Sequence, residues 1–170
     1  MAIKRVLVYY VILVVLASVL QAIPHILGAA FAFAAILGSF PVYIATRLNW
    51  VLGFAVYLTA AYISSIMNLG EALFFICTNG IIGLSLGIIK GRIKSIYYVP
   101  VPSVMIVILM LFAVNYLLGI SIFGYSQLKS PILQGFTLFL PLYIYCFIYL
   151  KLAMHTDTLL GKYIEVYKAN

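Results

Sequence analysis

Acidic residues are nearly missing from this chain of 170 residues, which has three of them against ten lysines and arginines. Charged residues make up 8% of the chain, whereas soluble domains carry about 25%, and 66% of the residues are hydrophobic. The basic residues are scattered between apolar runs and form no stripe with interleaved aromatic residues, so we expect no nucleic-acid partner. With a mean hydropathy of +1.22, the chain is predicted to be an integral membrane protein without a soluble domain.

Residues suited to catalysis or metal binding are also scarce. Cys77 and Cys146 lie inside apolar runs with no paired spacing, so we interpret them as small core residues. Apart from Glu71, the acids are Asp157 and Glu165, both near the C-terminus. No zinc-type spacing, paired carboxylates within a span or phosphate-binding glycine loop is found, and no ionisable group lies near the middle of a predicted span. We therefore expect no enzyme, no metal site and no cofactor.

Long apolar runs occupy most of the chain. The run from His25 to Thr46 carries no charge unless His25 is protonated, and it is long enough to cross a hydrocarbon core of roughly 30 Å as a helix. Similar runs predict an all-α polytopic membrane protein with six transmembrane helices, over Val6–Ile23, His25–Thr46, Trp50–Met67, Ala72–Ile89, Val99–Leu118 and Pro131–Met154. Residues 1–154 form one transmembrane domain, and 155–170 form a cytoplasmic tail.

Three details of these runs leave alternatives. The first run is either a signal peptide or a span, and Leu20 stands where cleavage after Ala22 would need a small residue, which favours a span. Pro41 and Pro141 predict a kink, or the end of regular helix at Pro41. The tail has apolar residues on one helical face and charges on another, so it is either a helix on the membrane surface or a solvated segment.

The basic residues predict the orientation of the six spans. If the N-terminus is cytoplasmic, nine of the ten lysines and arginines fall in cytoplasmic segments and only Lys129 falls outside. This distribution follows the positive-inside rule, so both termini are predicted to be cytoplasmic. We expect a multi-pass protein of the plasma membrane, in contact with membrane lipid.

Small residues recur at four-residue spacing in two of the predicted spans. Ala30, Ala34 and Gly38 form one such row, and small residues of this kind let a second helix approach closely in lipid. We predict that this row docks a partner protein. The fourth span carries a second close-packing face, which consists of Gly83, Gly87 and Gly91.

Polar residues gather at the predicted outer end of the bundle. Glu71 is the most informative, because ionisable groups at a membrane are costly and often bind a ligand; it would equally favour the positive N-terminal end of its helix. His25 is either a ligand-binding or an interfacial residue, and Asn79 in the fourth span either touches a ligand or bridges helices. The candidate substrate-binding residues are Glu71, Asn68, His25, Asn79, Asn115, Tyr116, Tyr125 and Lys129.

The chain resembles the substrate-binding S components of energy-coupling factor transporters. The likeness rests on six short spans, on the Ala30-x-x-x-Ala34 pattern, and on the segment from Phe40 to Lys94 with FPVYIATRLN, EALFF and GIIGLSLGIIKGR. In that family the alanine pattern lies in the first helix, whereas here it lies in the second predicted span.

The resemblance implies a function in micronutrient uptake. Ala30 and Ala34 would face a transmembrane T subunit, two ATPases would hydrolyse ATP, and a vitamin-like ligand would enter near Glu71. Two alternatives remain: a small scaffold subunit of a cell-envelope complex, similar in fold to MreD-like proteins, and an enzyme acting on membrane lipid. The lack of acid and base groups places the enzyme last.

Overall fold

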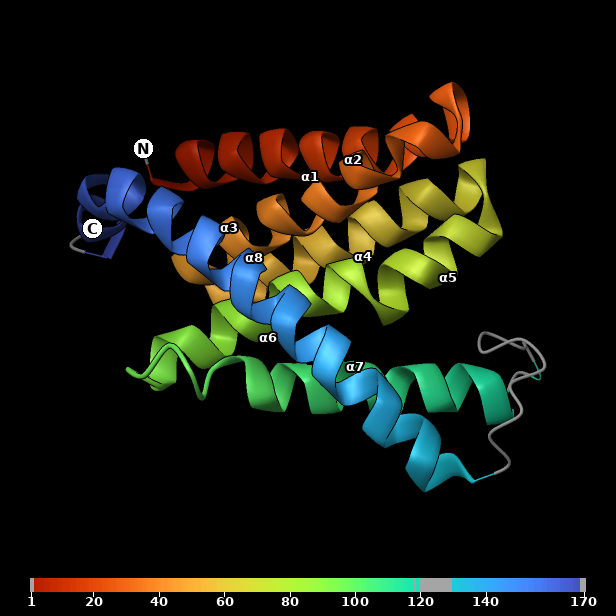
Figure 1. The fold of residues 1–170 in the computed structure, drawn as a ribbon. Coiled ribbons are helices and arrows are strands. Elements are labelled where there is room, and N and C mark those ends of the chain that lie inside the picture. Colours follow the sequence, from red (N-terminus) through yellow and green to blue (C-terminus); the bar gives the residue numbers. More distant parts are fainter. Residues whose placement is uncertain (1, 118, 120–129, 169–170) are drawn as a thin grey trace.

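The computed structural model describes residues 2–117, 119 and 130–168, and these residues form helices joined by short turns, with no strand among them (Figure 1). The predicted all-α class is confirmed. The elements are α1 (Ala2–Leu27), the 3₁₀ turn η1 (Ala29–Phe31), α2 (Ala32–Leu37), α3 (Ser39–Leu48), α4 (Trp50–Met67), α5 (Leu69–Cys77), α6 (Asn79–Arg92), α7 (Pro100–Leu117) and α8 (Pro131–Lys168).

The elements make six rods, because α2 and α3 follow one another along one line of the bundle and α5 and α6 along another. The start of α1 and the end of α8 lie at the same end of the bundle, which we call the terminal end (Figure 1). The α1–η1 and α4–α5 junctions lie at the opposite end, which we call the far end.

Among the described residues, four helices are long and apolar enough to cross a membrane: Leu7–Leu27, Trp50–Met67, Leu69–Arg92 and Ile132–His155. Ala32–Leu48 and Pro100–Tyr116 are apolar but shorter. Large hydrophobic side chains such as Leu58, Ile66 and Phe136 are exposed on the outside of the rods. So much exposed apolar surface is what a lipid-embedded protein presents, and the structure thus agrees with an integral membrane protein.

The boundary between the first two rods differs from the prediction. The helix α1 continues through Pro24 and His25 to Leu27, so His25 lies in the last turn of the first rod and does not begin the second. Gly28 follows with a φ of +95°, and its N–H donates to the carbonyl oxygen of Pro24 at 2.9 Å. A left-handed glycine at this position ends a helix, which is a role that apolar periodicity does not reveal.

The second rod breaks at Gly38, just before the predicted site at Pro41. The Gly38 N–H donates to the carbonyl oxygens of both Ala34 and Ala35, at 3.2 and 3.0 Å, and α3 begins at Ser39. Pro41 is the third residue of α3, within the first turn, where its missing N–H leaves no intrahelical hydrogen bond unmade. The regular helix therefore continues after the proline, to Leu48.

The last rod is uninterrupted. Helix α8 runs through Pro141 and on into the predicted tail, where the backbone is helical to Lys168. The tail therefore extends α8 without a loop. The bend expected at Pro141 stays a prediction.

The glycine face predicted in the fourth span packs inside this chain, where α6 lies against α3. A Cβ atom at Gly83 would overlap the backbone carbonyl oxygen of Ser39, and one at Gly87 would lie 2.7 Å from the Cβ of Thr46. Thr46 is confined from its other side by Gly53 of α4, where a Cβ would lie 2.6 Å from the Thr46 Cα. Glycine is thus required for the close approach of α3, α4 and α6, and the predicted close packing is confirmed at Gly83 and Gly87, whereas Gly91 is exposed.

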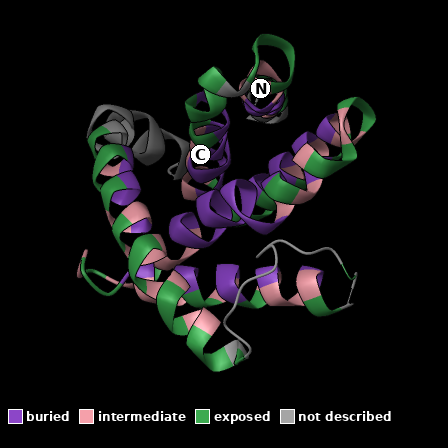
Figure 2. Cartoon of the chain, turned by 45° about the vertical axis from the view of Figure 1, so that its right-hand side comes forward, coloured by how far each residue is buried: buried purple, intermediate pink, exposed green. Residues whose placement is uncertain are grey.

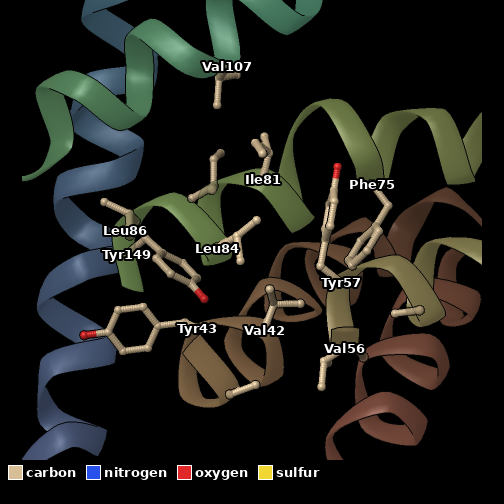
Figure 3. Close-up of a cluster of buried hydrophobic side chains, with 14 of the residues drawn as sticks. Val42, Tyr43, Val56, Tyr57, Phe75, Ile81, Leu84, Leu86, Val107 and Tyr149 are labelled. Atoms are coloured by element: carbon tan, nitrogen blue, oxygen red, sulfur yellow. The ribbon is translucent and has the colours of Figure 1, made fainter. Parts of the chain in front are cut away.

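The core surrounds α6, in which every residue from 79 to 87 is buried. Figure 2 shows the central helices almost entirely buried, whereas the peripheral ones are buried on one side. Side chains from α3 to α8 meet there (Figure 3). The Tyr57 ring lies 6.0 Å from that of Phe75, and its hydroxyl donates to the carbonyl oxygen of Ile76 at 3.1 Å.

Candidate functional site

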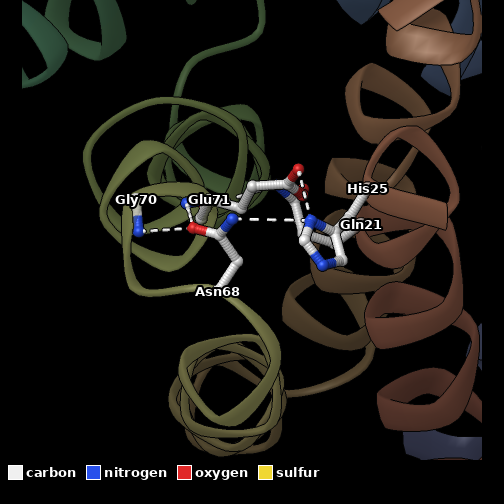
Figure 4. Close-up of polar contacts among 5 residues, drawn as sticks. All are labelled: Gln21, His25, Asn68, Gly70 and Glu71. Carbon is white, nitrogen blue, oxygen red and sulfur yellow. Dashed lines mark hydrogen bonds and ion pairs between the residues drawn. The ribbon is translucent and has the colours of Figure 1, made fainter. Parts of the chain in front are cut away.

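Three helices place polar side chains together at the far end of the bundle. The last two turns of α1 carry Gln21 and His25, the last turn of α4 and its C-cap carry Ser64 and Asn68, and the first turn of α5 carries Glu71. Figure 4 shows all of them except Ser64. We call these five residues the far-end cluster. Gln21 and His25 are four residues apart, as are Ser64 and Asn68, so each pair shares one helix face.

Asn68 holds the corner between α4 and α5. Its N–H donates to the carbonyl oxygen of Ser64 at 2.9 Å, which ends α4. Its side-chain oxygen accepts from the N–H groups of Gly70 and Glu71, at 2.8 and 3.2 Å, which begins α5. Its amide nitrogen lies 3.4 Å from Nδ1 of His25. One asparagine thus caps two helices and touches a third.

The Glu71 carboxylate is not used by the helix cap. In a capping box, the third residue of the helix accepts from the N–H of the N-cap residue, but the Asn68 N–H already donates to Ser64. Instead, Oε1 of Glu71 lies 3.9 Å from Nδ1 of His25, which makes an ion pair when the imidazole is protonated. The Glu71 side chain is 29% exposed, so its charge is only partly solvated.

Two buried oxygen atoms of the cluster lack a hydrogen-bond partner among the described residues. Gln21 is 2% exposed and its Nε2 donates to the Glu71 carbonyl oxygen at 3.4 Å, whereas its Oε1 has no partner. Ser64 is 5% exposed, and its Oγ has none either. Other buried side chains, such as Ser18 and Ser103, also have an oxygen without a partner among the described residues, so Gln21 and Ser64 are distinguished by lying together beside one hollow.

The far-end cluster lines a small hollow. Its wall is completed by Ala22 and Met67, and the space holds about one water molecule. Drug-sized ligands occupy about 300–1,000 Å³. The hollow is therefore the right size for a single polar group and too small for a whole vitamin.

The structure brings together three of the predicted substrate-binding residues, His25, Asn68 and Glu71. Asn79 lies apart, buried at the start of α6, and its Nδ2 donates to the carbonyl oxygen of Ala35 at 3.0 Å. It bridges α6 to the end of α2, which is the structural role considered for it above.

The remaining predicted substrate-binding residues are not part of the cluster. Asn115 and Tyr116 lie near the end of α7, where Tyr116 is 56% exposed and its ring packs 5.9 Å from that of Phe112. Tyr125 and Lys129 lie outside the described residues.

Gln21 and Ser64 escaped the sequence-based prediction. Each is a polar residue within an apolar run, where a neutral side chain attracts little attention. The signal that finds them is the four-residue spacing from Gln21 to His25 and from Ser64 to Asn68, which places each on the same face as a residue that was predicted.

The row of small residues predicted to dock a partner is split by the structure. Ala30 is exposed in η1, but Ala34 is 3% exposed and Gly38 is buried. A Cβ atom at Gly38 would lie 3.5 Å from the carbonyl oxygen of Ala17, so this part of the row packs against α1 of the same chain. Ala34 and Gly38 are thus buried within this chain, and the docking of a partner on this row stays a prediction.

Within the described residues, no group of three or more histidine, cysteine, aspartate and glutamate side chains lies close enough to hold a metal ion. Cys77 and Cys146 are buried and unpaired by disulfide, as expected for core residues. The chemistry of the far-end cluster is that of hydrogen bonding and charge recognition.

Comparison of the chain with models of known protein families, with curated proteins and with solved structures found no match.

Proposed function

We propose that the chain crosses the membrane six times with both termini in the cytoplasm. Two features support this topology. The terminal end carries Arg47 at the end of α3 and Lys90, Arg92 and Lys94 around the end of α6, whereas the far end carries Glu71. An excess of basic residues at one end marks the cytoplasmic side. The far-end cluster then faces the outside of the cell.

The topology is tested by cysteine accessibility in intact cells. In a chain whose Cys77 and Cys146 are replaced by alanine, Leu69→Cys is expected to react with a membrane-impermeant maleimide added outside. Lys94→Cys is expected to react only after the cells are opened. Both positions are exposed in the structure. Labelling of Lys94→Cys in intact cells would show that the chain has the opposite orientation.

On this topology, we propose that the protein is a substrate-binding subunit for uptake of a micronutrient, working with a transmembrane coupling subunit and ATPases. The observation that carries the proposal is the far-end cluster itself, in which three helices direct polar groups to one spot and two buried oxygens have no partner among the described residues. A polar cluster without catalytic or metal-binding groups is suited to recognition of a ligand.

A second function, a scaffold subunit in a cell-envelope complex, is favoured by a different observation. The rods α3, α4 and α6 are in glycine-mediated contact, and the hollow at the cluster holds about one water molecule. A filled bundle of this kind is suited to holding protein partners without moving a ligand. In this case the far-end cluster is the polar cap of the α4–α5 corner.

Native mass spectrometry of the chain, purified gently from its own host, separates the two functions. Uptake predicts a vitamin-sized adduct together with a co-purifying membrane subunit and ATPases. A scaffold predicts a chain without small-molecule adduct, bound to cell-envelope proteins. An adduct-free chain that binds no ATPase would refute the uptake function.

A further inference from the structure

We propose that the far-end cluster binds an ammonium group, which is either the ammonium ion itself or the charged end of a primary amine. The groups that hold it are Oε1 of Gln21, Oγ of Ser64 and the carboxylate of Glu71. This inference deepens the proposed uptake function and rests on it for the natural ligand, which would carry a primary amine.

The number and type of hydrogen-bonding atoms favour an ammonium group. A primary ammonium has three N–H donors and no acceptor. Gln21, Ser64 and Glu71 all line the hollow, and the Gln21 and Ser64 oxygens are buried and have no partner among the described residues. The Gln21 amide cannot be turned over without placing its oxygen against the Glu71 carbonyl oxygen, to which its Nε2 now donates. Its free atom is therefore an acceptor.

The electrostatics of the far end also favour a cation. Glu71 supplies a formal negative charge, and the basic side chain among the described residues of the hollow is that of His25, which carries a charge only when protonated. The C-terminal ends of α1 and α4 meet here, and the carbonyl ends of helices attract positive charge. The opposing N-terminal end of α5 is already occupied, because its Gly70 and Glu71 N–H groups donate to Asn68.

The size of the hollow limits the ligand. Its space for about one water molecule admits an –NH₃⁺ group but excludes a quaternary ammonium. A potassium ion is close to ammonium in size and lacks N–H donors, so it is the matched control for hydrogen bonding. Tetramethylammonium is the matched control for size.

The experiment titrates the purified full-length chain in lipid nanodiscs with methylammonium chloride, with ionic strength held constant by tetramethylammonium chloride. Binding is measured by calorimetry and by the rise in unfolding temperature. Methylammonium and ammonium are expected to bind, and potassium at least about tenfold more weakly. Equal binding of potassium and ammonium, or no saturable binding of either, would overturn the proposal.

Two variants test the named groups, and a neighbouring serine serves as the control. Glu71→Gln, which keeps the shape and removes the charge, is expected to weaken methylammonium binding at least about tenfold, and Ser64→Ala by about threefold to tenfold. Ser65→Ala is expected to leave binding within about twofold, because the Ser65 hydroxyl donates to the carbonyl oxygen of Tyr62 at 2.7 Å and does not line the hollow. Unchanged binding in both Glu71→Gln and Ser64→Ala would refute the site.

Two results distinguish the cation site from the uptake function. An amine-free vitamin found on the chain with its ATPases would refute the cation site and keep the uptake function. Saturable methylammonium binding by a chain that co-purifies only with cell-envelope proteins would keep the site and refute uptake.

Discussion

Adding one methyl group at Gly87 is expected to destabilise the protein, whereas the same change at Gly91, one turn further along α6, is not. At Gly87 the new Cβ would lie 2.7 Å from the Cβ of Thr46 and 2.8 Å from its Cγ2. Thr46 cannot withdraw, because Gly53 of α4 holds its other side. At Gly91 the nearest atom is Nη1 of Arg47 at 3.4 Å, the end of a flexible side chain.

These distances set the magnitudes. Replacing glycine by alanine in a helix contributes about 1 kcal/mol of stability, and overpacking a confined site costs about 1–3 kcal/mol. Since Thr46 is held on both sides, we take the upper part of that range for Gly87→Ala. The expected net loss is about 1–2 kcal/mol. Gly91→Ala, which meets only ordinary contact, is expected to be neutral or to gain up to about 1 kcal/mol.

The assay is reversible denaturant unfolding of each variant in the same detergent micelle, followed by circular dichroism. The double variant Thr46→Ser with Gly87→Ala removes Cγ2 but keeps the hydroxyl that donates to the Val42 carbonyl oxygen at 2.7 Å. It is expected to recover part of the loss, a coupling that only contacting residues show. A Gly87→Ala protein as stable as Gly91→Ala would refute the packing of α6 against α3.

Three further predictions concern single hydrogen bonds, each read from the same unfolding assay. Asn79→Ala is expected to lose about 1 kcal/mol, through the bond to Ala35, and to leave methylammonium binding unchanged; a loss of binding would return Asn79 to the ligand site. Tyr57→Phe removes the hydrogen bond to the Ile76 carbonyl oxygen and is expected to lower the free energy of unfolding by about 0.5–1.5 kcal/mol. An unchanged stability would show that this hydrogen bond is not made. Asn68→Ala removes the N-cap of α5 and is expected to lower the free energy of unfolding by about 0.5–2 kcal/mol, whereas Asn68→Asp keeps most of this stability. Equal losses in the two variants would show that the side chain of Asn68 does not cap α5.

The order and type of the helices were predictable from the chain because long apolar runs separated by polar residues form apolar helices joined by turns. The boundaries were harder. Pro24 and His25 read as a break between two spans, yet α1 includes both and ends at Gly28, which has a positive φ. A proline near the end of a helix and a glycine after it give the same local composition as a loop. Only the backbone conformation at Gly28 distinguishes them.

Small-residue spacing predicted close contact and not the identity of the contacting helix. In α6, Gly83 and Gly87 approach α3, and in the second rod Ala34 and Gly38 approach α1. Both contacts lie within the chain. A four-residue spacing is the same whether the neighbour belongs to the same chain or to another, so the accessible partner face could not be obtained from periodicity.

The grouping of His25, Asn68 and Glu71 was predictable for a topological reason. All three lie beside predicted turns at one end of the bundle, and turns at one end of antiparallel helices are close in space. Gln21 and Ser64 each lie one turn before His25 and Asn68, and whether a side chain there meets the cluster depends on the rotation of each helix about its axis. That rotation is set by tertiary packing, which the sequence does not state.

Hydrogen-bond satisfaction distinguishes the polar side chains at the helix breaks from those of the far-end cluster. At the breaks of both rods the residues are buried and their N–H groups donate to carbonyl oxygens of the preceding turn, as a membrane requires of irregular backbone. There, Asn79 donates to Ala35, and the Thr78 hydroxyl donates to the Phe74 carbonyl oxygen. Both polar side chains have partners, and that of Asn79 joins two rods. Gln21 and Ser64 are equally buried, yet each keeps an oxygen without a partner among the described residues, beside a carboxylate that its own helix cap does not use. The recognition chemistry of the protein is therefore expected at the far end, and not at the helix breaks.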